Sequence, residues 1–397
     1  MTGPSRLAAI AIALLSVPSC AGLPGSAPAH STQYEGKTIK LGAALSLTGP
    51  GAVYGPQQER AIRMAVDMLN RSSIDGAKLA VEIQDDGSTP SRAGEIFSTM
   101  AADPGLVGLI GPTLSNSAPA AHTVAEAAGV PVVAVSTTGN GIVGNCPYRC
   151  GYIFRDSLGE SRAIPANVQA AVDERHPSTA ALLFVRDDKF SSDGAAAFRQ
   201  AFDDQGIQLL GEFSFSKNET DISSYVTRAV GAQPDLLAVA GVGRIPGEIL
   251  VDAHRQGFRG LVLGGNGFNT PAVARAAGAA GAGAQSASGY YAGNSDPANQ
   301  AFVAAYRARY GQTPDQFAAQ AYAGVMIIAE AARRARLTFT DSAGDRTRLR
   351  DALTTINLDT PMGPFSFTTQ HDVGQTIWVV AMDGVGGYRL VKAIPAA

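Results

Sequence analysis

The chain has 397 residues, of which 45% are hydrophobic and 16% are charged. This is the composition of a folded globular protein and excludes a disordered or collagen-like chain. Its 31 Lys and Arg against 34 Asp and Glu give a net charge of -3 without a basic run, which argues against a nucleic-acid-binding surface.

The N-terminal residues have the pattern of an export signal. Arg6 supplies a positive charge, and the apolar run that follows at 7–17 has the length of the hydrophobic region of a signal peptide. This run is too short to cross a bilayer, and no other stretch of the sequence is apolar enough to do so. We therefore expect residues 1–19 to be a signal peptide and the mature protein to be exported.

A lipid-anchoring signal ends this segment. The run stops at Cys20 as at a bacterial lipoprotein processing site, although Pro18 departs from the small residue usual there. Residues 20–36 are rich in Gly, Pro, Ser and Ala and show no apolar period, which is typical of a flexible linker. We expect Cys20 to be lipidated and to hold the protein at the cell membrane. Ordinary secretory cleavage that discards Cys20 is the alternative.

From residue 37 onward, short aliphatic runs alternate with longer stretches of helical spacing. The first strand, predicted at 39–47, leads into residues 55–70, where apolar side chains recur at i, i+3 and i+4. Such alternation indicates an α/β fold with parallel sheets covered by helices on both faces. Because single cores stop growing at roughly 250 to 300 residues, we expect two doubly wound lobes. The other predicted strands are 78–84, 106–110, 131–135, 179–185, 206–215, 235–241 and 260–265.

Two turns at predicted strand ends are rich in hydroxyl groups. The strand at 106–110 is followed by a turn that contains Ser115, directly before a helix, and the strand at 131–135 is followed by Ser136 and Thr138. Ligands of open α/β sheets bind at the carboxyl ends of strands, and the free N–H groups of a helix start favour an anion. We predict that these turns bind a ligand carboxylate. Plain helix capping and a solvated loop are the alternatives.

Two further cysteines, Cys146 and Cys150, follow the second turn. Zinc usually needs four ligands, and the sequence offers no second cysteine pair or neighbouring His to complete a site. The five His residues show no metal-ligand spacing either, so we expect no metal. Because an exported protein meets an oxidising compartment, we expect a disulfide between Cys146 and Cys150 that staples a loop beside the cleft. Free thiols are the alternative.

Other catalytic and cofactor motifs lack the context that their chemistry needs. The glycine-rich segment 241–247 follows a strand, but the next strand ends at Asn266 rather than at the acidic residue that a dinucleotide fold requires. The S-x-x-K match at 214–217 lies at a strand end instead of a helix start. The sequence contains no G-x-S-x-G, H-E-x-x-H or Walker motif. We therefore expect neither an enzyme nor a bound cofactor.

Several short motifs follow one another in a fixed order. Residues 45–70 contain T-G-P, then Y-G, then a helix that ends in Asn, and residues 110–117 contain I-G-P and S-N-S. Residues 128–138 have the sequence AGVPVVAVSTT. In order and spacing these motifs resemble the leucine/isoleucine/valine-binding type of solute-binding protein. Further similarities extend the resemblance over about 38–390, at 154–155, 187–188, 296–311 and 362–367.

The resemblance implies both a fold and a function. Such proteins have a type I periplasmic-binding fold, with two lobes joined by three hinge crossovers, and deliver a solute to an ABC transporter permease without chemistry. We accordingly expect a branched-chain amino acid, or a related small carboxylate or amide, to be captured between the lobes. An exported receptor domain of the same fold, signalling to a partner, is the alternative. The implied lobes are 37–155 with 292–357, and 156–291 with 358–397.

The resemblance also implies which residues contact the ligand. Ser115 and Thr138 would hydrogen-bond its carboxylate, Ser136 would offer a backbone contact, and Tyr54 and Tyr322 would line the cleft.

One position departs from the pattern of the amino-acid binders. Where they carry an acidic residue that pairs with the α-ammonium group of the ligand, this chain has Asn266. An amide accepts a hydrogen bond but carries no charge, so we expect weaker recognition of an ammonium group at this turn. Around Phe190 the family often has Tyr-Gly, so the aromatic residue there is displaced or replaced.

Overall fold

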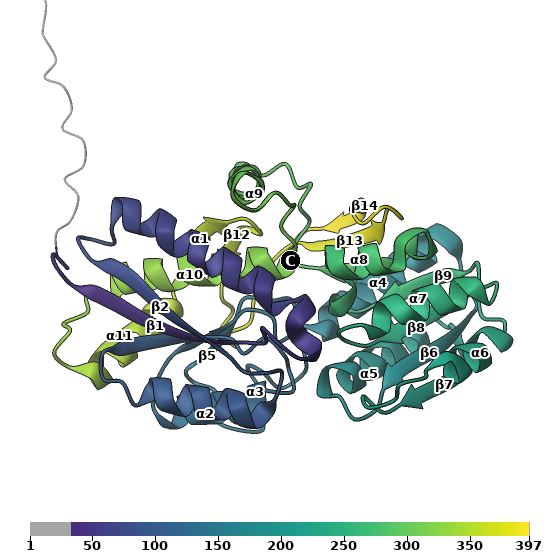
Figure 1. Ribbon diagram of the computed structural model, residues 1–397, viewed down its shortest axis with the longest axis horizontal. Helices are drawn as coiled ribbons and strands as arrows, with labels where there is room; N and C mark the ends of the chain where they lie inside the picture. The colour runs from purple at the N-terminus through teal and green to yellow at the C-terminus, as the bar shows by residue number, and fades with distance from the viewer. Residues whose placement is uncertain (1–32, 397) are drawn as a thin grey trace, which may run out of the picture.

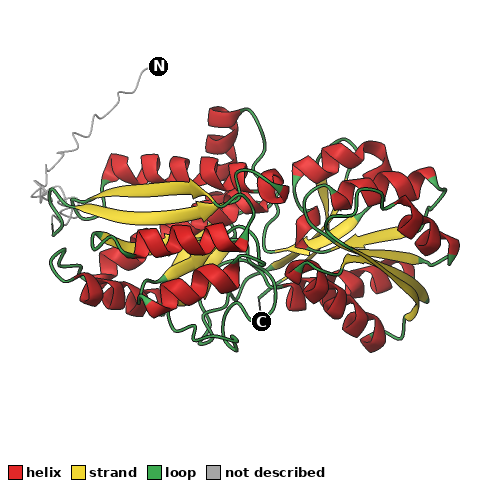
Figure 2. Ribbon diagram, turned by 60° about the horizontal axis from the view of Figure 1, so that its bottom comes forward, coloured by secondary structure: helices red, strands yellow, loops and turns green. Residues whose placement is uncertain are grey.

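The computed structural model describes residues 33–396 and shows two α/β lobes side by side (Figure 1). In each lobe a sheet lies between layers of helices (Figure 2). The α/β fold with two parallel sheets, expected from the alternation in the sequence, is confirmed. The predicted signal peptide and the predicted lipidation site at Cys20 lie outside the described residues.

The first lobe contains a five-stranded parallel sheet in the order β2-β1-β3-β4-β5. Helices α1, α10 and α11 cover one face, and α2 and α3 cover the other. The strands are β1 (Thr38–Leu45), β2 (Lys78–Asp85), β3 (Leu106–Ile110), β4 (Val132–Ala134) and β5 (Ile153–Arg155). The helices are η1 (Pro50–Val53), α1 (Gly55–Ser72), α2 (Pro90–Ala101), α3 (Ala118–Ala127), α9 (Pro297–Tyr310), α10 (Gln316–Ala335) and α11 (Ser342–Leu353).

The second lobe contains a seven-stranded sheet in the order β14-β13-β10-β9-β8-β6-β7. Five of its strands are parallel, and β13 and β14 form an antiparallel edge. The strands are β6 (Thr179–Val185), β7 (Gln208–Phe215), β8 (Leu236–Ala240), β9 (Leu261–Gly264), β10 (Gln285–Ser288), β13 (Ile377–Met382) and β14 (Tyr388–Ile394). The helices are α4 (Glu160–Arg175), α5 (Lys189–Asp204), α6 (Ser223–Gly231), α7 (Ile245–Arg255), η2 (Asn266–Phe268), α8 (Pro271–Ala277) and η3 (Gly278–Gly281).

The chain passes between the lobes three times, after β5, after β10 and before β13. The last passage comes later than the boundary expected at 357/358. The hairpin of β11 (Asn357–Thr360) and β12 (Gly363–Ser366) belongs to the first lobe, because Phe365 and Phe367 are buried in its core. Phe367 also packs against Phe154 of β5, with ring centroids 5.0 Å apart.

An ion pair joins the first and third of these crossovers. The guanidinium of Arg155 is 6% exposed and binds both carboxylate oxygens of Asp372, at 3.0 and 2.5 Å. Arg155 also donates to the carbonyl of Gly139, and Arg162 donates to the carbonyl of Val373 at 2.7 Å. The two crossovers are therefore fixed to each other by partly buried, charge-assisted hydrogen bonds.

Cys146 and Cys150 form a disulfide in the loop between β4 and β5. Cys150 borders a surface hollow together with Arg149, Arg350 and His371. Neither cysteine lines the interlobe pocket described below, so the disulfide constrains a peripheral part of this loop. Among residues 33–396, no helix has the length and hydrophobicity that crossing a bilayer requires.

Candidate ligand-binding site

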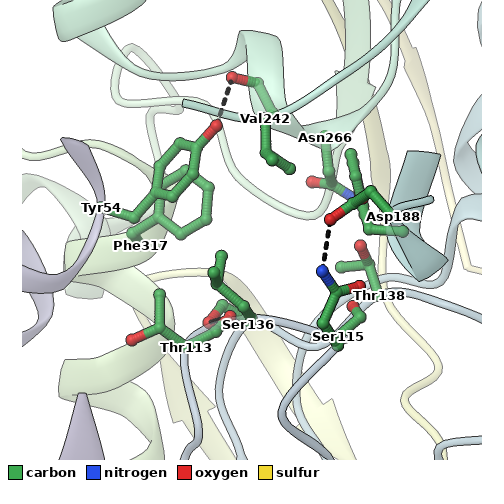
Figure 3. A pocket seen from close by; sticks show the side chains of 13 residues that line it. Tyr54, Thr113, Ser115, Ser136, Thr138, Asp188, Val242, Asn266 and Phe317 are labelled. Atoms are coloured by element: carbon green, nitrogen blue, oxygen red, sulfur yellow. Dashed lines mark hydrogen bonds between the residues drawn. The ribbon is translucent and has the colours of Figure 1, made fainter. Parts of the chain in front are cut away.

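A pocket lies between the lobes, where the carboxyl ends of strands from both sheets face each other (Figure 3). It encloses about 360 Å³ of atom-free space, part of it open to solvent. The lining residues are Tyr54, Thr113, Leu114, Ser115, Asn116, Ser136, Thr138, Asp188, Phe190, Val242, Asn266, Gly267 and Phe317.

The structure brings together five of the six residues predicted to contact the ligand, namely Tyr54, Ser115, Ser136, Thr138 and Asn266.

The sixth predicted contact, Tyr322, lies in the core of the first lobe instead of in the pocket. Its hydroxyl donates to the Met68 sulfur at 2.9 Å, and its ring packs against Phe302 with centroids 4.8 Å apart. Phe317, in the first turn of α10, lines the pocket from this helix. The difference arises because only the start of α10 reaches the cleft.

The turn that contains Ser115 presents an uncapped helix start. Ser117 occupies the N-cap position of α3, yet its side chain makes no capping hydrogen bond, so helix capping does not account for these serines. The Ser115 hydroxyl accepts a hydrogen bond from the N–H of Gly139 at 3.2 Å, which joins the two hydroxyl-rich turns. Free N–H groups at the positive end of α3 can therefore meet an anion beside the Ser115 hydroxyl.

Ser136 takes part in a buried network below the pocket. Its hydroxyl donates to the carbonyl of Thr113 and accepts from the amide of Gln58, both at 2.8 Å. Thr113 in turn donates to Gln58 at 2.6 Å and accepts from the N–H of Ser46. Because these partners occupy the side chain of Ser136, a ligand would meet the backbone of this residue.

An aromatic wall closes another side of the pocket. The rings of Tyr54 and Phe317 pack with centroids 4.4 Å apart. The Tyr54 hydroxyl accepts from the N–H of Gly243 at 3.1 Å and donates to the carbonyl of Gly267 at 3.4 Å, so it bridges the lobes. Burial raises the pKa of Tyr54 far above its usual value, which keeps this hydroxyl protonated.

A buried acid, Glu160, lies directly beside the pocket at the start of α4. Its carboxyl accepts from the N–H of Asn266 at 2.9 Å and from the hydroxyl of Thr138 at 3.3 Å. Burial raises the pKa of Glu160 to about 7, although these hydrogen bonds oppose that rise. Glu160 thus connects a turn of the first lobe with a turn of the second.

Further hydrogen bonds cross from one lobe to the other. The Asn116 side chain donates to the Asp188 carboxylate and accepts from the N–H of Lys189 at 2.8 Å. From α10, the Gln316 amide donates to the carbonyl of Asn266 at 2.7 Å. These contacts on several sides of the pocket show that the lobes are closed over it.

Eight lining residues were not among the predicted contacts. Those of the second lobe follow predicted strands, so the rule that ligands bind at the carboxyl ends of strands was the signal that could have found them. Asp188 also caps α5, because its side chain accepts from the N–H of Ser191 at 2.8 Å. The eight are Thr113, Leu114, Asn116, Asp188, Phe190, Val242, Gly267 and Phe317.

Within the part of the chain that the structure describes, no cluster of His, Cys, Asp or Glu could hold a metal ion.

The sequence matches one protein family over most of its length. The family profile of the periplasmic binding proteins matches residues 38–387. The leucine-, isoleucine-, valine-, threonine- and alanine-binding protein of Pseudomonas aeruginosa is 24% identical over 339 residues, which is 85% of this chain and 87% of that protein.

Solved structures resemble this one closely. The branched-chain amino acid transporter substrate-binding protein LivJ from Streptococcus pneumoniae, in complex with isoleucine, has a TM-score of 0.80 and 25% identity, with 91% of this chain and 99% of that chain covered. A solute-binding protein of an ABC transporter from R. palustris, in complex with benzoate, has a TM-score of 0.81 and 20% identity, with 91% and 97% covered. These likenesses show that the two lobes form a type I periplasmic-binding fold.

Proposed function

The chain belongs to the family of periplasmic binding proteins, and on this premise we propose that it captures a small carboxylate-bearing solute for an ABC importer. The solute is a branched-chain amino acid or a related carboxylate or amide. It binds between the lobes, is held while they are closed, and passes unchanged to the permease. The chain acts on it by binding alone.

The observation that carries this proposal is the interlobe pocket with its uncapped helix start at α3. N–H groups at the positive end of a helix, together with a neighbouring hydroxyl, form a site for a carboxylate. The two solved relatives are complexes with isoleucine and with benzoate, and a carboxylate is the group that these ligands share. The small volume of the pocket limits the size of the rest of the solute, and the apolar side chains that line the pocket limit its polarity.

Closure follows from the position of the binding groups. Ser115 and Thr138 belong to the first lobe, whereas Val242 and Asn266 belong to the second. A solute that first binds the first lobe gains contacts with the second only when the lobes close. It therefore shifts the population toward the closed state, which is the form that a permease would bind.

Replacing Ser115 with Ala is expected to weaken binding of the carboxylate solute by about 10- to 100-fold, because a hydrogen bond to a charged group is lost. The measurement is calorimetric titration of the mature protein with leucine, isoleucine and benzoate. Ser117→Ala is the matched control, since Ser117 is buried two residues away and does not line the pocket. Equal affinity of the Ser115 variant and the wild type would contradict the assignment of an anion-binding turn. The absence of any saturable ligand in a broad solute screen would contradict the proposed function.

We further propose that the protein is exported and held at the membrane through a lipid on Cys20. Cys20→Ser is expected to move the protein from the membrane fraction of its host to the soluble fraction, because the acceptor thiol of the lipid is missing. Immunoblots of the two fractions measure this shift. An unchanged distribution would favour ordinary secretory cleavage instead.

A further inference from the structure

The second-lobe wall of the pocket presents an amide oxygen without a donor and a carboxylate without a paired cation, among the residues that the structure describes. The Asn266 side chain is 3% exposed, and its NH2 group donates to the carbonyl of Leu158 at 3.0 Å, which fixes the orientation of the amide. Within residues 33–396, its oxygen has no hydrogen-bond partner. In Figure 3 this oxygen points toward the pocket, on the same wall as the carboxylate of Asp188.

Asp188 is the one carboxylate among the lining residues, and it is only 5% exposed. Within residues 33–396 no Lys, Arg or His forms an ion pair with it, and the neighbouring Lys189 binds Asp193 instead, at 2.8 Å. The N–H of Ser191 and the amide of Asn116 each donate to one of its oxygens. A carboxylate has about four acceptor positions, so Asp188 can accept further hydrogen bonds.

A buried carboxylate without a cation is unusual, because buried charges are normally paired. The N-terminus of α5 and the amide of Asn116 compensate part of the charge of Asp188. A cationic group in the pocket would complete the compensation. An ammonium group fits these surroundings, since it offers three donors and no acceptor and so matches both Asp188 and the free oxygen of Asn266.

We propose that Asp188 binds the α-ammonium group of the solute, with the Asn266 side-chain oxygen as a second acceptor, so that the pocket selects amino acids over the corresponding carboxylic acids. This inference rests on the proposed function. Asp188 then supplies, from the turn after β6, the negative charge that is missing at Asn266. The carboxylate of the amino acid lies against the first lobe at Ser115, and its ammonium group lies against the second.

This arrangement links selectivity to closure. Because Asp188 belongs to the second lobe, its contact with the ammonium group forms only when the lobes close. A carboxylic acid without this group still binds the first lobe but gains less from closure, so it shifts the population toward the closed state less strongly.

The test compares amino acids with the same molecules lacking the ammonium group. Leucine is paired with 4-methylpentanoate, valine with 3-methylbutanoate and phenylalanine with 3-phenylpropanoate, and benzoate is added as an aromatic acid. Calorimetric titration of the wild type is expected to show at least one amino acid that binds about 30-fold or more tightly than its partner. Equal or tighter binding of the acids would overturn the inference and leave the proposed function standing. Failure of every compound to bind would overturn both.

Asp188→Asn is expected to reduce the preference for the amino acid to about 3-fold or less while binding of the carboxylic acid persists. Asn caps a helix as well as Asp does, so α5 should stay intact, which thermal denaturation checks. Asp187→Asn is the matched control, because Asp187 is exposed, binds Ser216 and Lys217 and does not line the pocket. Asp188→Glu keeps the charge and should retain more of the preference than Asn does. Full preference in the Asp188→Asn variant would contradict the assignment.

Discussion

Replacing Glu160 with Gln is expected to remove a large part of the pH dependence of stability. Burial raises the pKa of this carboxyl from 4.5 to about 7, so the folded protein binds the proton more tightly than the unfolded chain does. The resulting stabilisation is complete below about pH 4.5 and is lost as the pH rises through about 7. For one group shifted this far, the loss amounts to about 3 kcal/mol of the free energy of unfolding.

Urea denaturation from about pH 4.5 to about pH 8 measures this effect. The wild type should lose stability across the range, and the Glu160→Gln variant should lose about 3 kcal/mol less. Burial also raises the pKa of Asp315 to about 6 and holds the pKa of Asp156 well above its usual range. Both groups are present in both proteins, so the difference between the two curves isolates Glu160. Parallel curves would contradict the raised pKa.

Replacing Gly243 with Ala is expected to weaken solute binding by about 10- to 100-fold, because the new methyl group would hold the lobes apart. Gly243 follows β8, and a Cβ there would lie 2.9 Å from the carbonyl oxygen of Pro50 in the other lobe. That contact exists only while the lobes are closed. The open state is therefore unaffected by it, and the closed, solute-binding state becomes less favourable.

Calorimetric titration measures the loss of affinity, and small-angle scattering at saturating solute should show a more extended particle. The φ of Gly243 is 66°, so part of the cost is backbone strain that has nothing to do with closure. Gly257→Ala controls for this strain, because Gly257 has φ 88° and a Cβ at this position would meet no atom within 4 Å. Equal affinities of the two variants would show that the contact with Pro50 does not govern binding.

The strands of the sheets could be predicted where burial is continuous. The runs at 106–110 and 179–185 coincide with β3 and β6, because nearly every side chain in them is buried. The antiparallel edge formed by β13 and β14 was not predicted. Its place depends on pairing with β10, some 90 residues earlier in the chain, and no local pattern encodes such a contact.

The site could be predicted only in part, for a related reason. The turns of Ser115 and Thr138 stand out because several hydroxyl groups follow an aliphatic run. Asp188 caps a helix and lines the pocket at once, and sequence alone shows only the first role. Tyr322 and Phe317 lie on the same helix, and which of them reaches the cleft depends on how α10 is placed against the sheet.

The contact between Arg155 and the carbonyl of Gly139 has a consequence for how fast a solute can be taken up. Arg155 belongs to the hinge, and Gly139 adjoins Thr138 in the turn that faces the solute. The arginine therefore shapes this turn through the framework of the hinge, whether or not the cleft is occupied. We expect an arriving molecule to meet a half-site whose shape this hydrogen bond has already set, so that little ordering entropy is lost on encounter and capture is limited mainly by diffusion into the open cleft.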